Sequence, residues 1–352
     1  MTTRMAVVGC GHLGAIHARL LAARADVELV AVVDPVAEQR ERVAAAHGCA
    51  AWAEPHALVG QVEAAVIAAP TGLHAAVALP LLEAGIDLLV EKPLAASVED
   101  ARAIVIAARR HGRTVSVGHV ERFNPAWQAV ADRARGATFL EVERLAPFTF
   151  RSLDVGVVHD LMIHDIDLVL SLEPGRLERV EARGLVATGG HEDAVRARLT
   201  FASGLIADLT ASRINPALER RLSMWTASGI VAVDFNAKSV TVVGASPAVQ
   251  AGEFVAAQVP AADRTALKER FFTDVLPIET VAVADANAIA AEHDDLLDSI
   301  RTRRAPLVSA AAGAAAVEIA ARVLESLDCL QFGSGRHVTT PTIPLYPRRK
   351  TG

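Results

Sequence analysis

Gly9-Cys10-Gly11-His12-Leu13-Gly14 follows a short apolar run and precedes an alanine-rich, helix-like run. A GxGxxG pattern between a first strand and a first helix is typical of a turn that binds a dinucleotide. The glycines allow a tight turn and let the backbone approach a pyrophosphate, whose charge is attracted by free N–H groups at the helix start. A glycine turn without a ligand is the alternative interpretation. We predict that this turn binds a cofactor through Gly9, Gly11, His12, Leu13 and Gly14.

The pattern around this turn predicts a parallel sheet. From residue 4 to about residue 118, short aliphatic runs alternate with alanine-rich helical stretches, as they do in βαβ units. Gly48, Gly85 and Gly112 follow three of the helical stretches, where a left-handed cap is favoured. The predicted strands are 5–8, 27–33, 65–69, 87–90 and 114–117, and the predicted helices are 13–24, 36–47, 73–84 and 98–111.

The second part of the chain has a different pattern. Strand-like segments arrive at short intervals, separated by Gly, Ser, Asn and Pro, and this spacing indicates an antiparallel meander. Helices are predicted near 125–135 and at 157–172, 286–302 and 310–327, and strands at 138–144, 179–187, 195–201, 206–212, 221–226, 230–234 and 239–243.

We therefore predict an α/β fold with two domains. Residues 1–122 form an N-terminal Rossmann domain with a parallel sheet, and residues 123–335 form a C-terminal α+β domain that carries a mostly antiparallel, open sheet. Residues 336–352 form an irregular tail. The length of 352 residues agrees with two domains, since one domain has about 150 residues on average.

Composition excludes several classes of function. An apolar fraction of 52% with 22% charged residues indicates a globular protein. No apolar run approaches the roughly 20 residues of a membrane span, and a net charge of -6 argues against nucleic acid as a partner. Cys10, Cys49 and Cys329 are widely spaced and predict neither disulfides nor a metal site. The start of the chain shows no export signal, so we expect a cytoplasmic protein.

Asp34 stands twenty residues after Gly14, at the end of the second predicted strand. A carboxylate at this place accepts hydrogen bonds from the adenosine ribose and repels the additional phosphate of NADP. The alternative interpretation is an aspartate that starts a turn before Pro35. The sequence therefore predicts NAD as the cofactor.

Two later segments follow predicted strands and are expected at the carboxyl edge of the sheet, where open α/β sheets bind ligands. The first is Ala69-Pro70-Thr71 with His74, and the second is Glu91-Lys92-Pro93. We predict that Ala69, Pro70, Thr71, His74, Glu91 and Lys92 complete the cofactor site, together with Arg122 at the end of the last strand of the first domain.

With the glycine turn, Ala-Pro-Thr-x-x-His and Glu-Lys-Pro in this order, the chain resembles the Gfo/Idh/MocA oxidoreductases, which include glucose-fructose oxidoreductase and inositol dehydrogenase. The resemblance covers nearly the whole chain. It implies that the Lys92-Pro93 bond is cis and that the protein is a homo-oligomer, a dimer or a tetramer.

Three further segments resemble one branch of this family, the UDP-N-acetylglucosamine 3-dehydrogenases, which make a 3-keto nucleotide sugar for later amination. They are GHVERFNP at 118–125, DVGVVHDLMIHDID at 154–167 and TASR at 210–213. One departure is that the only tyrosine is Tyr346, in the tail. A tyrosine found in the substrate site of some relatives therefore has no counterpart in the second domain.

Oxidation of a secondary alcohol needs a base for the hydroxyl proton and a group that holds the oxygen. Lys92 can hold the oxygen. Asp160 and His164 are four apart on a predicted helix, so they share one face, with Asp167 three residues beyond His164. We predict Lys92, Asp160 and His164 as the catalytic group, with His164 as the base, Asp160 as its partner or a substrate anchor, and Asp167 as its orienter. The alternative is that Asp160, His164 and Asp167 form an ordinary buried polar network. A zinc site of His159, Asp160 and His164 is conceivable, but no cysteine or further histidine cluster lies at zinc-finger spacing, so no metal is predicted.

Arginine binds phosphate in a bidentate way, so arginines of the second domain are candidates for a substrate diphosphate. Arg151 and Arg213 are favoured because they lie in or beside the segments that resemble the branch. The full candidate set is Arg144, Arg151, Arg213, Arg220 and Arg221. Lys92, Asp160 and His164 complete the predicted substrate site.

The sequence supports three hypotheses. The first is NAD-dependent oxidation of a secondary alcohol on a sugar, the 3-hydroxyl of UDP-N-acetylglucosamine. The second is an inositol or simple sugar dehydrogenase of the same family. The third is a non-catalytic NAD-binding regulator, because fold alone does not give function; the presence of Lys92, Asp160 and His164 argues against it, since a sensor needs only the glycine turn.

Overall fold

Six parallel strands form the first sheet of the computed structural model, which describes residues 2–150, 153 and 155–338. Their spatial order is β3-β2-β1-β4-β5-β6. Side chains of alternate residues point to opposite faces of a strand, and the strands β4 and β5 are buried along their whole length. Both faces of this sheet are therefore covered. The strands are β1 (Thr3–Val8), β2 (Val27–Val33), β3 (Ala50–Trp52), β4 (Ala64–Ile67), β5 (Asp87–Glu91) and β6 (Val115–Gly118).

Helices cover the two faces of this sheet with separate apolar clusters. One cluster joins alternate strand residues such as Val7 and Val66 to α1 (His12–Ala22), α2 (Ala37–His47) and α9 (Ala288–Thr302). The other joins the opposite residues to α3 (His74–Glu83) and α4 (Val98–His111). The Rossmann prediction is confirmed. Gly48, Gly85 and Gly112 follow their helices with φ of +68°, +85° and +61°, as predicted.

The second sheet has ten strands in the order β14-β13-β12-β11-β7-β10-β9-β8-β15-β16. Neighbours are parallel at β7–β10 and β8–β15 and antiparallel elsewhere, so the prediction of a mostly antiparallel sheet is confirmed. The strands are β7 (Phe139–Leu145), β8 (Leu177–Val186), β9 (Ala194–Phe201), β10 (Ile206–Ser212), β11 (Glu219–Thr226), β12 (Gly229–Asp234), β13 (Ser239–Gly244), β14 (Ile278–Val281), β15 (Leu327–Gln331) and β16 (His337–Val338).

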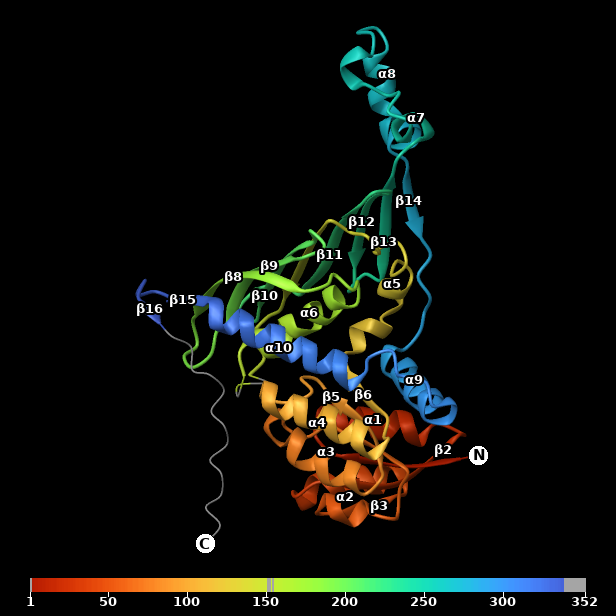
Figure 1. Cartoon of the computed structure of the whole chain (residues 1–352), viewed down its shortest axis with the longest axis vertical. Coiled ribbons are helices and arrows are strands. Elements are labelled where there is room, and N and C mark those ends of the chain that lie inside the picture. Colours follow the sequence, from red (N-terminus) through yellow and green to blue (C-terminus); the bar gives the residue numbers. More distant parts are fainter. Residues whose placement is uncertain (1, 151–152, 154, 339–352) are drawn as a thin grey trace.

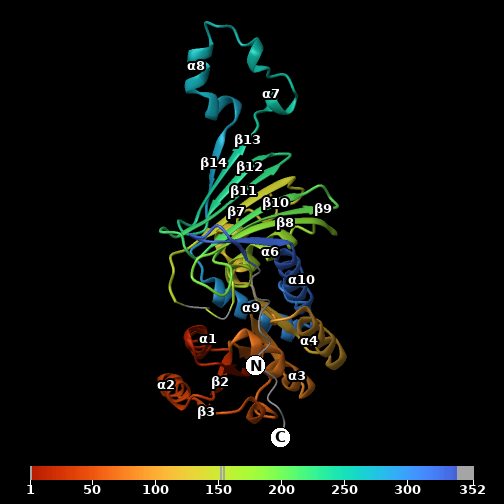
Figure 2. The ribbon, with the colours of Figure 1, turned by 90° about the vertical axis from the view of Figure 1, so that its left-hand side faces the viewer.

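Two helices lie between this sheet and the first domain. They are α6 (Ile163–Leu170) and α10 (Ala310–Ser326), and Figure 2 shows both on the same side of the sheet. Along β7 buried and partly exposed residues alternate, which is the pattern of a sheet with one covered face. The other face carries surface ion pairs such as Arg198 with Asp208. This arrangement places α6 where it can face the first domain.

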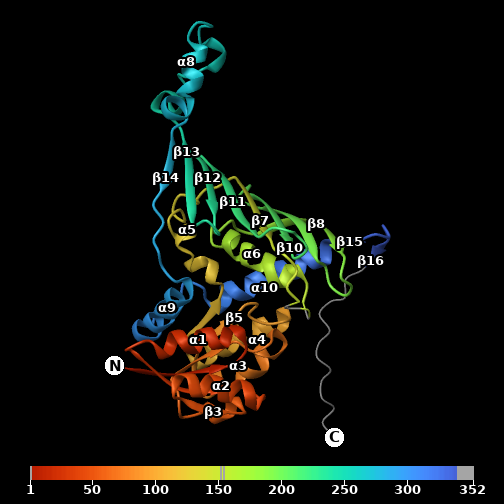
Figure 3. The same ribbon diagram turned by 180° about the vertical axis from the view of Figure 1, so that it is seen from behind.

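The C-terminal helices connect the two domains. α10 packs against α4 and β6 of the first domain and against α6 and β8 of the second. α9 belongs to the second domain in the predicted division, yet it packs against α1 and η3 (Val120–Phe123) of the first (Figure 3). Between β13 and β14, residues 245–277 form short helices, including α7 (Pro247–Gln250) and α8 (Arg264–Glu269), that project beyond the sheet (Figure 1).

Several predicted elements differ from the structure. The three-residue strand β3 was not predicted, because it is too short to show a period. The predicted helix 125–135 has only α5 (Pro125–Gln128) as a regular helix. The helix predicted at 157–172 starts with the π-helical turn η4 (Val158–Met162) before α6. The predicted irregular tail contains β16, which pairs with β15. No helix in the described part of the chain combines the length and apolar character that crossing a membrane requires.

Candidate active site

A cavity of about 1230 Å³ lies between the glycine turn, the carboxyl edge of the first sheet and the second domain. Residues from both domains line it, so the site is complete only when the two domains are packed together. Of the predicted and candidate site residues, those that line the cavity are Gly9, Gly11, His12, Leu13, Asp34, Ala69, Pro70, Lys92, Asp160, His164, Arg213 and Arg220.

The glycine turn has the shape that a dinucleotide needs. Gly9 has a φ of +96°, and a Cβ there would lie 2.5 Å from the carbonyl oxygen of Ala68. A Cβ on Gly14 would overlap the carbonyl oxygen of Gly9, so the glycine lets α1 pack closely against the turn. Gly14 does not line the cavity. A Cβ on Gly11 would meet nothing within 4 Å. No side chain caps the N-terminus of α1 at Gly11, which leaves N–H groups available to a phosphate.

Asp34 lines the cavity beside the glycine turn. Its Oδ2 accepts a hydrogen bond from the N–H of Cys10 at 2.8 Å, and its Oδ1 accepts one from Val36 at 2.8 Å. These bonds fix the carboxylate beside the glycine turn, and each oxygen keeps capacity for a further donor. A ribose diol is such a donor pair, so the residues present fit the adenosine half of NAD.

His74 connects the two loops at the carboxyl edge. Its Nδ1 lies 2.9 Å from the carbonyl oxygen of Pro93 and its Nε2 lies 2.9 Å from that of Ala69. Burial lowers the pKa of His74, although both carbonyls favour the charged form. The Lys92–Pro93 bond is cis, as the resemblance implied. His74 and Thr71 do not line the cavity; His74 instead positions the residues that do.

Lys92 and Asp160 meet across the domain boundary. The Lys92 ammonium donates to the backbone carbonyl of Asp160 at 2.6 Å and to its Oδ1 at 3.1 Å. The two side chains are 15% and 24% exposed, so the ion pair faces the cavity and is shielded from bulk water. Asp160 is paired with Lys92 and not with His164, which removes one of the two roles predicted for Asp160. Its predicted role as an anchor for a substrate hydroxyl stays a prediction.

His164 lines the same cavity one helical turn further on. Burial, followed by the charges of Lys92 and Arg144, lowers its pKa well below 6.5. Its Nδ1 is buried without a hydrogen-bond partner, and its ring lies edge-on to that of His119 at 6.2 Å between centroids. The predicted contact of Asp167 with His164 is wrong: the Asp167 carboxylate lies 3.6 Å from Arg122.

The predicted cofactor residues Arg122 and Glu91 also lie away from the cavity surface. The Arg122 side chain is 13% exposed and forms the ion pair with Asp167. Glu91 accepts hydrogen bonds from the N–H of Lys92 at 3.2 Å and from His17 at 2.8 Å. Neither side chain lines the cavity, and Glu91 supports the loop that carries Lys92 through its hydrogen bond to the N–H of Lys92.

The candidate arginines have three different positions. Arg144 is buried between two carboxylates. Its Nη2 donates to Oδ1 of Asp165 at 2.7 Å, and its Nη1 donates to Oε1 of Glu121 at 2.8 Å. It is therefore a structural residue behind α6 and not a phosphate ligand. Arg221 pairs with Glu219 and Asp234 and does not line this cavity. Arg151 lies outside the described residues.

Arg213 and Arg220 line the cavity from the second domain. Arg213 is 8% exposed, with its Nε 2.7 Å from Asp193 and its Nη1 2.9 Å from the carbonyl oxygen of Val155. Arg220 is 42% exposed, and its Nη1 lies 3.8 Å from Glu121. Phe148 and Leu218 join them in the cavity wall. These two apolar residues were not predicted, because an aromatic residue or a leucine in a loop carries no specific signal for a ligand.

Comparison with known proteins agrees with this architecture. Residues 3–119 match the family described as "Oxidoreductase family, NAD-binding Rossmann fold", and residues 126–231 match the GFO/IDH/MocA C-terminal domain. UDP-N-acetylglucosamine 3-dehydrogenase of Acidithiobacillus ferrooxidans is 34% identical over 311 residues, 88% of this chain and 92% of that protein. Its solved structure, GnnA, has a TM-score of 0.81 at 32% identity and covers 93% of this chain and 98% of that one.

Two further proteins are more distant. scyllo-Inositol 2-dehydrogenase (NAD(+)) of Bacillus subtilis is 29% identical over 60% of this chain and 68% of that protein. The WlbA dehydrogenase from Bordetella pertussis, solved with NADH and UDP-GlcNAcA, shares the fold with a TM-score of 0.71 at 20% identity, over 93% of this chain and 96% of that one. The two matched domains and the extended identity agree with the ordered motifs and with the cavity between the domains, and this protein therefore belongs to the Gfo/Idh/MocA family of oxidoreductases.

Proposed function

We propose that this protein oxidises the 3-hydroxyl of UDP-N-acetylglucosamine, or of a related UDP-N-acetylhexosamine, to the 3-keto sugar with NAD. The observation that carries the proposal is the position of Lys92, Asp160 and His164 in the same cavity as the glycine turn and Asp34. The choice of substrate is supported by the relative with 34% identity, which is a UDP-N-acetylglucosamine 3-dehydrogenase.

NAD supplies the ring that accepts a hydride from the sugar carbon. Lys92 can hold the reacting oxygen, because an ammonium has three N–H groups and Asp160 accepts from two of them. The positive charge of Lys92 stabilises the negative charge that develops on this oxygen. His164 is uncharged before reaction and takes the hydroxyl proton. The charge of Lys92 is one of the causes that lower the pKa of His164. The negative charge that develops on the substrate oxygen offsets the charge of Lys92, so the pKa of His164 rises as it takes the proton.

The substrate diphosphate would lie near Arg220 and Arg213. Arg220 is the better candidate for a direct bidentate contact, since its half-exposed guanidinium has Glu121 only at 3.8 Å. Arg213 already donates to Asp193 at 2.7 Å and to the carbonyl oxygen of Val155, so it contributes positive charge to this part of the cavity. An inositol has no charged group that would need these arginines.

An assay of reduced-cofactor absorbance tests the proposal directly. Purified protein is incubated with NAD and, separately, with UDP-N-acetylglucosamine, other UDP-sugars, free sugars and inositols. We expect turnover with the UDP-N-acetylhexosamines. Faster turnover of inositol would assign the second hypothesis, and tight NAD binding without turnover of any alcohol would assign the regulator. A cytoplasmic location and a dimeric or tetrameric state stay predictions.

Variants test the catalytic group. We expect Lys92→Met and His164→Asn to fold, to bind NAD and to lose about 100-fold or more in kcat, as when a general acid or base is removed. Lys268→Met is the control, because Lys268 is exposed on α8, far along the projecting segment. Turnover that is unchanged in either active-site variant would refute the assigned role.

A further inference from the structure

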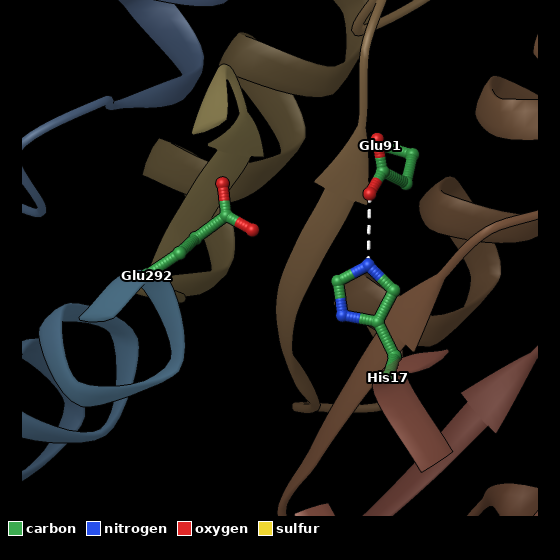
Figure 4. Close-up of side chains that lie close together, drawn as sticks. All are labelled: His17, Glu91 and Glu292. Atoms are coloured by element: carbon green, nitrogen blue, oxygen red, sulfur yellow. Dashed lines mark hydrogen bonds and ion pairs between the residues drawn. The ribbon is translucent and has the colours of Figure 1, made fainter. Parts of the chain in front are cut away.

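Two carboxylates and two imidazoles meet behind the loop that carries Lys92. His17 comes from α1, Glu91 from the end of β5, and Glu292 and His293 from α9. All four are buried: His17 and His293 are 0% exposed, Glu292 is 1% exposed and Glu91 is 8% exposed. Figure 4 shows the side chains of His17, Glu91 and Glu292 directed toward one shared space.

The hydrogen bonds of this cluster leave one carboxylate unsatisfied. His17 Nε2 lies 2.8 Å from Glu91 Oε1, and His17 Nδ1 lies 2.8 Å from His293 Nε2. Oε1 of Glu292 and Nδ1 of His293 are buried without a hydrogen-bond partner. An isolated buried carboxylate is strongly unfavourable unless it is paired, coordinates a metal or is protonated. Burial, with the charges of Glu91 and Asp295, raises the pKa of Glu292 well above its ordinary value.

We propose that His17, Glu91 and Glu292 bind a divalent first-row transition metal ion. Each offers one ligand atom, and these atoms lie within 4.8 Å of one another. Imidazole nitrogen with carboxylate oxygen is a donor set that suits Zn²⁺ or Mn²⁺, and the cluster contains no thiolate that would favour a softer ion. An ion would compensate the two carboxylates, which have no arginine or lysine side chain bonded to either of them in the described chain.

His293 completes this arrangement as a positioning residue. A histidine that binds a metal usually hydrogen-bonds through its other ring nitrogen, and this bond fixes the tautomer and the ring orientation. His293 Nε2 is the partner that His17 Nδ1 needs. The ion would join α9 to α1 and to the residue before Lys92. It would therefore hold the catalytic loop from behind, outside the cavity. The sequence predicted no metal, since these residues lie too far apart in the chain for any spacing rule.

Metal titration of the untagged full-length protein tests the proposal. After dialysis against a chelator, Co²⁺ is added while visible absorption is recorded, and Zn²⁺ is added before a thermal melt. We expect one Co²⁺ per chain with d–d bands, and a rise of Tm with Zn²⁺. Elemental analysis of the protein before dialysis adds a measure that does not depend on metal exchange, with about one equivalent of metal expected.

Two matched variants decide between a ligand and a neutral acid. Glu292→Gln keeps the shape and removes the charge, so it should fold in either case and should weaken Co²⁺ binding by about tenfold or more. Glu318→Gln, at a 53% exposed position on α10 paired with Arg102, should bind Co²⁺ like the wild type. The proposal would be overturned if the wild-type protein contained no metal and responded to Co²⁺ and Zn²⁺ no more than Glu292→Gln does. Glu292 would then be a protonated acid.

Discussion

The protonation state of His164 is set by residues around it. Burial, Lys92 and Arg144 lower its pKa well below 6.5, so the imidazole is neutral near pH 7 and can accept a proton. Only protonation of His164 at low pH removes this capacity. We therefore expect kcat/KM to stay constant from about pH 8 to about pH 6.5 and to fall at more acidic pH, because kcat/KM reports groups of the free enzyme. A pH profile with its acid limb centred at or above about pH 7 would contradict His164 as the base.

Asp34 is the residue that should select NAD over NADP. Replacement by serine removes the charge that repels a 2′-phosphate and one of the two backbone contacts, to Cys10 or to Val36. We expect Asp34→Ser to weaken NAD binding about tenfold, or about 1.4 kcal/mol, and to improve NADP binding. Fluorescence titration with each cofactor measures this, with the exposed Asp132→Ser as the control. An unchanged preference for NAD would show that another group discriminates between the cofactors.

At the scale of elements, Arg144 joins β7 to α6 and η3 through Asp165 and Glu121. Arg144→Met leaves Asp165 without its cation and Glu121 with only Arg220 at 3.8 Å. Breaking a buried pair in this way costs about 3–5 kcal/mol. Urea unfolding measures the loss. Arg198→Met, which removes the half-exposed pair with Asp208 on the outer face of the sheet, should cost about 0–1 kcal/mol. Equal losses in the two variants would show that the buried cluster carries no particular stability.

Whole elements could be predicted from the sequence, whereas the buried ion pairs of Arg144 could not. α4 was predicted at its observed bounds because its apolar residues recur at helical spacing. β2 was predicted because it is a short aliphatic run between two aspartates. β3 has three residues and β16 has two, too few for a period. Lys92 was found from its place after a strand, and His164 from its spacing to Asp160. The partners of Arg144 could not be found, because ion pairs between distant elements leave no local pattern.

At the scale of the whole molecule, one helix unites the two domains. α10 packs on β6 and α4 of the first domain and on α6 and β8 of the second. β6 continues into η3, which carries Glu121 of the Arg144 cluster, and α6 carries His164. The position of α10 therefore influences how the two halves of the cavity meet.

Gly313 of α10 lies against Val117 of β6 with no room for a side chain. A Cβ on Gly313 would lie 2.7 Å from Cγ2 and 3.0 Å from Cγ1 of Val117, so any side chain must push the helix or the strand away. Overpacking of this kind costs about 1–3 kcal/mol, more than a helix gains by losing a glycine. We expect Gly313→Val to lower the free energy of unfolding, measured in urea, by about 1–3 kcal/mol. Ala315→Val, two residues on and exposed, should cost only about 0.5 kcal/mol through helix propensity. If Gly313→Val were as stable as Ala315→Val, the close contact between α10 and β6 would not contribute to the joining of the domains.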